Sequence, residues 1–138
     1  MVPLYDLRLG CLVTMESDAI WNRAAMRAGG SDARAGDQAL AALLRFHNRA
    51  MSGGVLDALT ELDPVELDDA IEGYRYLDLV QVADVVEPLR QECDRRTDDE
   101  FEVEADARYA ALVPDDAMLV EAFERRLRER PGDFAPAG

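Results

Sequence analysis

Hydrophobic residues recur every three or four positions along most of the chain, which is the spacing of an amphipathic helix. The first such pattern begins at Ser17 or Asp18 and ends at a pair of glycines, Gly29 and Gly30. Asp37 can cap a second helix that reaches about Met51. After the turn at residues 52–54, a short third helix is predicted over residues 55–62.

The second half of the chain predicts four more helices from their start signals. Asp63 can accept a hydrogen bond from a first-turn amide, Pro64 suits the first helical position, and Glu66 stands where a capping box places its acid. Asp78 is expected to open the next helix, which Pro88 should kink or break. After residue 62, one helix is predicted to begin at Pro64. Three more are predicted over residues 78–93, 97–112 and 116–130.

The ends of the last two helices carry further local signals. Thr97 and Glu100 form a capping box for the helix over residues 97–112. The final helix has Asp115 and Asp116 at its positive end and four arginines at its negative end, where cations are favoured. After this helix, Phe134 is expected to fold back on the body as an anchor.

These patterns predict one compact all-α domain of six or seven short helices over residues 17–135. Residues 4–15 alternate loosely between apolar and polar side chains, so residues 1–16 are interpreted as an extended or β-strand arm. Residues 136–138 are interpreted as a tail. A length of 138 residues suffices to bury a core without disulfides or a metal ion.

The net charge of the chain is −14, and the excess of acidic residues is confined to one segment. From Asp57 to Asp106 there are eighteen acidic residues and four arginines, whereas the remainder has eleven of each and no lysine occurs anywhere. Such a charge disfavours direct binding to nucleic acid and to anionic membranes, and it attracts basic partners.

Few residues offer chemistry. The one histidine, His47, lies on an apolar stripe and is interpreted as a hydrogen-bonded core residue. Cys11 and Cys93 match no ligand spacing, and no phosphate loop, dinucleotide motif or calcium loop occurs, so neither a metal nor a cofactor is expected. The aromatic residues interpreted as core are Trp21, Tyr74, Tyr76 and Tyr109. The N-terminus has no basic leader and no transmembrane run occurs, so a reduced, cytoplasmic location is expected.

Three stretches carry a resemblance to a known family. They are ALAALLRFHNRAMSGGVLDALTEL, LDDAIEGYRYLDLVQVADVVEPL and DARYAALVPDDAMLVEAFERRLRERPGDF. Within residues 17–135 the chain resembles a family of small bacterial domains known chiefly as the C-terminal domain of a DNA-mimic protein. Ser52, Val55 and Asp78 depart from it, since the family usually has asparagine, an aromatic residue and glycine there. The resemblance implies an all-helical fold, dimerisation, and an acidic surface that occupies the DNA site of a basic protein.

The leading hypothesis is therefore a non-enzymatic interaction protein that engages a basic DNA-binding protein or another cationic protein. Three alternatives stay open: an immunity or antitoxin-like protein, acidity that serves solubility only, and an enzyme with a buried carboxylate pair near Tyr74, Tyr76 or Tyr109. The residues predicted to form the acidic face are Asp57, Glu61, Asp68, Asp69, Glu72, Asp84, Glu87, Asp98, Asp99, Glu100 and Glu102.

Overall fold

The computed structural model describes residues 16–137, and within this range every regular element is a helix. The all-α prediction is confirmed. Of the arm predicted for residues 1–16, residues 1–15 lie outside the described residues, and Glu16 is helical. The elements are a helix over residues 16–27, α2 (Ala35–Gly53), α3 (Val55–Glu61), α4 (Pro64–Tyr76), α5 (Val80–Glu92), α6 (Asp99–Leu112), α7 (Asp116–Glu129) and a 3₁₀ turn, η1 (Pro131–Asp133).

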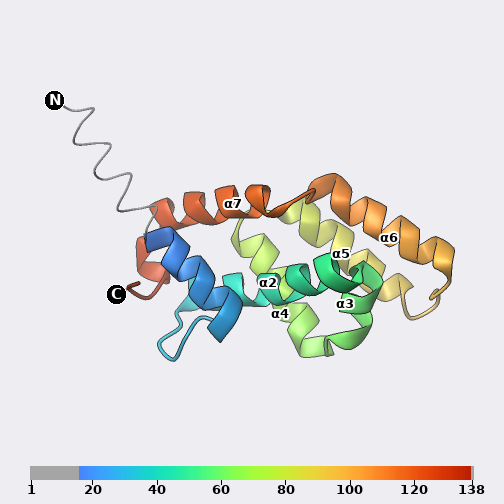
Figure 1. Cartoon of the computed structure of the whole chain (residues 1–138), viewed down its shortest axis with the longest axis horizontal. Helices are drawn as coiled ribbons and strands as arrows, with labels where there is room; N and C mark the ends of the chain where they lie inside the picture. The colour runs from blue at the N-terminus through green and yellow to red at the C-terminus, as the bar shows by residue number, and fades with distance from the viewer. Residues whose placement is uncertain (1–15, 138) are drawn as a thin grey trace.

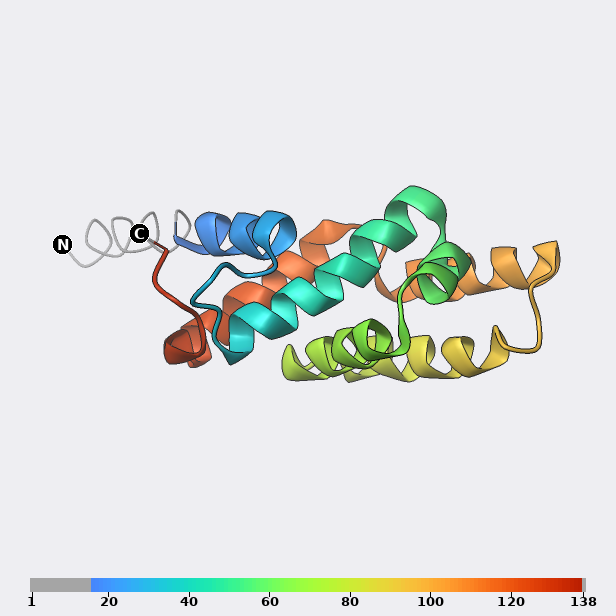
Figure 2. The same cartoon turned by 90° about the horizontal axis from the view of Figure 1, so that it is seen from below.

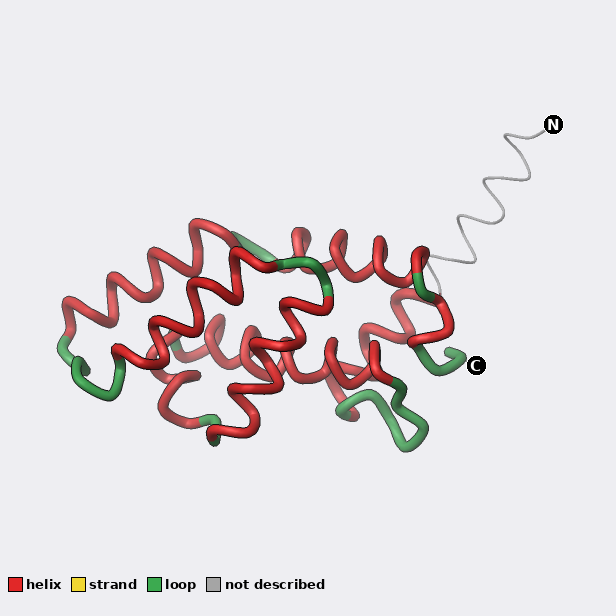
Figure 3. Tube along the Cα trace, turned by 180° about the vertical axis from the view of Figure 1, so that it is seen from behind, coloured by secondary structure: helices red, strands yellow, loops and turns green. Residues whose placement is uncertain are grey.

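The helices form an elongated body around α2 (Figure 1). The helix over residues 16–27, the end of α7 and the C-terminal tail gather at one end of this body (Figures 1 and 2). Toward the other end, α4 packs on α2 and on α5, and α6 packs on both α3 and α5 (Figure 2). The connections between successive helices are short (Figure 3). None of the described helices is long and apolar enough to cross a lipid bilayer.

The crossing of α2 and α4 depends on a glycine. A Cβ at Gly73 would lie 2.4 Å from the carbonyl oxygen of Ala39, so only glycine lets the two backbones approach this closely. Around this contact the chain buries one continuous core, in which Leu40, Leu43, Phe46 and Tyr74 are fully buried. Helical stability here comes mostly from such packing, since short helices are marginal by themselves.

Two helix starts follow the local sequence signals. The Asp63 carboxylate accepts from the amide of Glu66 at 2.8 Å, and the Glu66 carboxylate accepts from the amide of Asp63 at 3.0 Å. At the start of α7, the Asp115 carboxylate accepts from the amide of Ala117 at 2.9 Å. The capping prediction for α4 is therefore confirmed, and Asp115 and Asp116 lie at the start of α7 as predicted.

Other helix boundaries were predicted wrongly. The first helix already includes Glu16, so neither Ser17 nor Asp18 caps it. The helix α2 begins at Ala35, so Asp37 lies within its first turn and is not its cap. Asp98 caps α6 by accepting from the amide of Phe101 at 2.7 Å, one residue after Thr97. Asp78 does not open α5. It follows α4 with a φ of +65°, and α5 begins at Val80.

Pro88 does not break α5, which is helical from Val80 to Glu92. Proline deprives the carbonyl of residue 84 of its helical donor. Both Asp84 and Pro88 are exposed, so water can supply that hydrogen bond. Met51, near the predicted end of the second helix, has a side chain that is 54% exposed, whereas Phe46 of the same helix is fully buried.

The C-terminal tail is bound to the start of α2, as the anchor prediction requires. Phe134 is buried against the rings of Tyr76 and Phe123. A Cβ at Gly36 would lie 2.6 Å from the Phe134 ring, so this glycine makes room for it. The buried Asp37 carboxylate accepts from the Ala135 amide at 2.7 Å and thereby fixes the tail to α2.

Candidate acidic interaction surface

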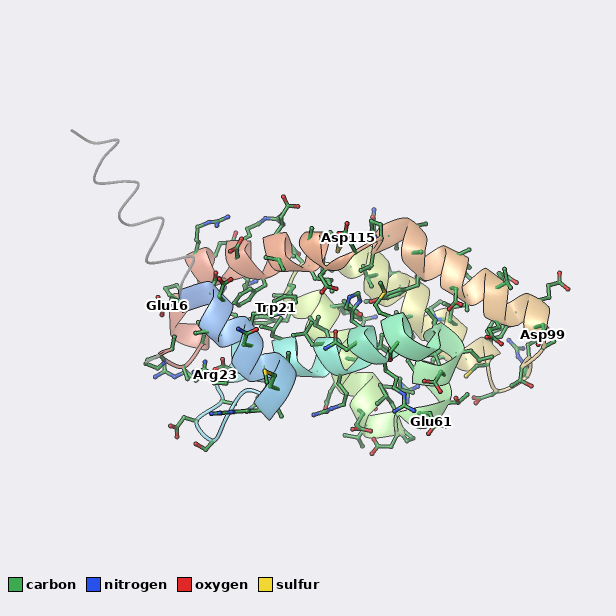
Figure 4. All side chains as sticks on the ribbon, viewed as in Figure 1. Glu16, Trp21, Arg23, Glu61, Asp99 and Asp115 are labelled. Atoms are coloured by element: carbon green, nitrogen blue, oxygen red, sulfur yellow. The ribbon has the colours of Figure 1, made fainter. Side chains whose placement is uncertain are left out.

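The segment with the excess negative charge forms a distinct part of the molecule. The helices α3 to α6 occupy the middle and the end of the elongated body that lies away from both termini (Figure 1). We call this part the acidic half and define it as residues 55–112. Glu61 and Asp99, which mark the outer parts of the acidic half in Figure 4, both project away from the core.

Most side chains predicted for the acidic face are accessible. Of the eleven residues, nine are exposed, and only Asp57 and Glu87 are half-buried. They do not lie in a single flat row. Instead they follow α3, the adjacent helices α4 and α5, and the first turn of α6.

Arginines neutralise part of this surface. Arg49 of α2 lies 2.8 Å from Asp57 and 3.9 Å from Glu61. Arg75 lies 2.8 Å from Glu72. An ion pair between exposed side chains contributes only about 0–1 kcal/mol, so these pairs position carboxylates more than they stabilise the fold.

Two of the ion pairs join α4 to α5. Arg75 of α4 lies 2.8 Å from Glu87 of α5, and Arg90 of α5 binds Asp68 of α4. Because each pair has one member on each helix, the two helices carry their carboxylates at fixed relative positions. The packing of α4 on α5, more than these ion pairs, gives the acids along both helices a stiff support.

The first turn of α6 carries the densest unneutralised charge. Asp99, Glu100 and Glu102 are exposed and form no ion pair among the described residues, and Asp69 and Asp84 share that property. The three α6 acids stand at the positive end of the helix dipole, where negative side chains stabilise a helix.

Asp98 differs from these neighbours because its carboxylate accepts a backbone hydrogen bond and lies near an arginine. The amide of Phe101 donates to it, and this hydrogen bond, helped by Arg96 at 3.7 Å, lowers the pKa of Asp98 below its usual value. The Arg96 guanidinium also lies 3.2 Å from Glu92 and 3.4 Å from Glu104. One arginine thus holds three carboxylates together at the turn between α5 and α6.

Asp106 was not among the predicted face residues, yet it organises the acidic half. Its carboxylate accepts from the amide of Val55 at 2.8 Å and so satisfies the first turn of α3 from a different helix. Gly54, with a φ of +98°, turns the chain between α2 and α3 at this point. No local motif in the sequence could signal this contact, since 51 positions separate the two residues.

Two of the buried polar residues, His47 and Asp37, form separate groups of contacts. His47 is fully buried and lies within hydrogen-bond distance of Tyr109 and Asp116, which confirms its interpretation as a core residue. Asp37 is the only buried carboxylate in residues 16–137, and its oxygens are occupied by Arg23 and by backbone amides. The described residues therefore contain no buried carboxylate pair of the kind that the enzyme alternative needs.

The aromatic residues lie where the core interpretation predicts, with differences in depth. Tyr74 and Tyr109 are buried, whereas Trp21 and Tyr76 are partly buried and pack on the edge of the core. Burial raises the pKa of the Tyr74 and Tyr109 hydroxyls well above the usual tyrosine value. Among the described residues, no three His, Cys, Asp or Glu side chains are arranged to hold a metal ion.

Comparison with known proteins identifies the family. No curated protein and no solved structure matches the chain. The model of the family described as DMP19-like protein matches residues 32–135, which include α2 to α7 and the entire acidic half. Because this match covers about three quarters of the sequence, the chain belongs to the DMP19-like protein family.

Proposed function

We propose that this protein is a non-enzymatic DNA mimic whose acidic half occupies the DNA-binding surface of a basic protein. The observation that carries the proposal is the location of the charge. The whole net charge of −14 arises from the segment between Asp57 and Asp106, which lies in one part of the folded body. Membership of the DMP19-like family, a family of DNA mimics, supports the same reading.

A mimic has to present negative charge at fixed positions, as B-DNA does with one charge per ~1.7 Å of its axis. The acidic half meets this need with carboxylates on helices that are packed and cross-linked. Asp99, Glu100 and Glu102 supply charge that no described arginine neutralises. Their like charges repel one another, and a cationic partner removes that repulsion.

The paired carboxylates contribute as well. Two or more carboxylates share each of three arginines, Arg49, Arg75 and Arg96. The negative charge in each of these groups is therefore only partly neutralised. Because exposed pairs contribute little, arginines or lysines of a partner can replace these internal contacts at small cost. Binding should therefore be fast, driven by complementary fields, and sensitive to salt.

Competition with DNA tests the proposal. A basic DNA-binding protein from the same cell is first bound to a fluorescent DNA duplex. The acidic protein is then added in increasing amounts, and the fluorescence anisotropy of the duplex measures how much DNA is released. At roughly 50 mM salt we expect release, and at roughly 200 mM salt we expect the affinity of the protein pair to fall by at least tenfold. If no basic DNA-binding protein of that cell is bound at low salt, or if salt leaves the affinity unchanged, the proposal is wrong.

A matched pair of triple variants locates the interface. The first combines Asp99→Asn, Glu100→Gln and Glu102→Gln, and we expect it to weaken binding by about tenfold or more. The control combines Asp18→Asn, Glu16→Gln and Glu121→Gln, which removes the same charge from exposed positions outside the acidic half. Equal weakening by both would show that net charge alone drives binding, and it would contradict a defined mimic surface.

A further inference from the structure

A hollow lies at the end of the described chain opposite the acidic half. It has a volume of about 740 Å³. Arg23, Arg27 and Arg34 line it, together with the loop over residues 29–32 and the tail over residues 135–137. Figure 4 labels Arg23 at this end of the body, below the C-terminal part of α7. Three cations around one hollow are unexpected in a protein with a net charge of −14.

The interactions within the folded chain leave part of the hydrogen-bonding and ion-pairing capacity of these three arginines unsatisfied. Arg27 is exposed and has no ion pair among the described residues. The guanidinium of Arg34 donates to the carbonyl oxygens of Gly132 and Phe134, at 3.2 and 3.3 Å, and to no carboxylate. The buried Nε of Arg23 has no hydrogen-bond partner.

The nearby acids do not cancel this charge. Asp37 is already occupied, since Nη2 of Arg23 lies 2.8 Å from Oδ1 and two backbone amides donate to Oδ2. Asp32, the one acid that lines the hollow, is exposed and forms no ion pair with the three arginines. The charge of Arg23 is thus neutralised by Asp37, whereas no described carboxylate neutralises Arg27 or Arg34.

We propose that this hollow binds a phosphate group carried by a small molecule. Guanidinium groups recognise phosphate through paired N–H donors, and here they come from the first helix and from the loop before α2. Two uncompensated cations match the double negative charge of a phosphate monoester, whereas a single carboxylate would leave one cation unmatched. The proposal is independent of the DNA-mimic function, because it concerns the other end of the molecule.

The charge of the protein decides between a small ligand and a nucleic acid. A long polyanion would extend beyond the hollow into the field of a protein with net charge −14, which repels it. A small phosphate can lie wholly within the hollow, where the guanidiniums are close and the distant acids are screened within about 8–10 Å at physiological salt.

Thermal unfolding and calorimetry with inorganic phosphate and pyrophosphate test the proposal, with sodium chloride and succinate at equal ionic strength as references. We expect both phosphates to raise the melting temperature by about 3–6 °C at ten times their dissociation constants, and succinate to do so far less. No protection beyond that of chloride, or equal protection by succinate, would overturn the phosphate assignment. Binding of a short DNA duplex more tightly than pyrophosphate would overturn the small-ligand assignment.

Two single variants identify the residues. Arg27 forms no ion pair, so Arg27→Gln should fold normally and weaken phosphate binding by about tenfold, the effect of one charge-assisted hydrogen bond. Arg125→Gln removes an exposed arginine from α7 outside the hollow and should leave binding unchanged. If both variants weaken binding equally, the phosphate is attracted by general charge and the hollow is not its site.

Discussion

The hydroxyl oxygen of Tyr109 lies 2.8 Å from Nδ1 of His47, and both side chains are buried. The same hydroxyl lies 2.6 Å from that of Tyr74, and Nε2 of His47 lies 2.6 Å from the Asp116 carboxylate. The contacts join α2, α4, α6 and the start of α7. When Nε2 of His47 carries the proton, Nε2–H donates to Asp116, Tyr109 donates to Nδ1, and Tyr74 donates to Tyr109, so every buried group is satisfied.

Removal of the Tyr109 hydroxyl, in the middle of this chain of hydrogen bonds, should lower the free energy of unfolding more than removal of the Tyr74 hydroxyl at its end. Tyr109→Phe leaves both Nδ1 of His47 and the Tyr74 hydroxyl without a partner, so we expect a loss of about 2–3 kcal/mol in the free energy of unfolding. Tyr74→Phe leaves the bond between Tyr109 and His47 intact and should cost about 1 kcal/mol. Urea unfolding of both variants checks this order, and a smaller effect for Tyr109→Phe would contradict the network.

The raised tyrosine pKa values predict a loss of stability in alkaline solution. In the folded protein, burial keeps the Tyr74 and Tyr109 hydroxyls protonated above their usual pKa of about 10. The unfolded chain releases these protons first, so the stabilisation is complete below about pH 10 and declines as the pH rises further. Urea unfolding at increasing pH measures the decline.

A double variant provides the control for this pH dependence. Tyr74→Phe with Tyr109→Phe removes two of the protons involved and should make the decline above pH 10 less steep by up to ~2.7 kcal/mol per pH unit. A slope identical to that of the unchanged protein would mean that other groups cause the alkaline loss.

Local signals in the sequence predicted the helices well. The sequence from Asp63 to Glu66 predicts a helix start because donor and acceptor are three residues apart and need no tertiary contact. The stripe that contains His47 places it in the core for the same reason, since helical periodicity alone determines which side chains share a face. Asp98 shows the limit of this approach, because Thr97 is equally suited to cap a helix and the side chains alone do not decide between them.

Contacts between distant segments could not be predicted. Asp37 looks like a helix cap in the sequence, yet its main partners are Arg23 and the amide of Ala135, which is 98 positions away. The acidic face shows the same limit. The spacing of carboxylates identifies the charged helices, but only the packing of α4 on α5 brings Arg75 to Glu87.

Asp37 should be the most sensitive polar position of the described chain. Asp37→Ala removes the carboxylate that pairs with the half-buried guanidinium of Arg23, which keeps only the carbonyl oxygens of Ala135 and Pro136. It also leaves two amides without their acceptor, so we expect a loss of roughly 3 kcal/mol. Hydrogen exchange at the Ala135 amide should accelerate beyond the global loss, because that amide donates to Asp37 directly. Asp32→Ala, an exposed neighbour, is the control and should stay within about 0.5 kcal/mol.

The end of α4 offers a stabilising substitution. The amide of Leu79 donates to the carbonyl of Tyr74 at 2.8 Å and that of Asp78 donates to Arg75 at 2.9 Å, which is the Schellman arrangement that usually ends in glycine. Asp78 adopts the required left-handed conformation, with a φ of +65°, at a cost that glycine avoids. Asp78→Gly should therefore raise the free energy of unfolding by about 0.5–1 kcal/mol in urea titrations. Asp78→Ala, which removes the same charge but keeps the Cβ, should give no gain, and equal stabilisation by both variants would assign the effect to charge instead of backbone strain.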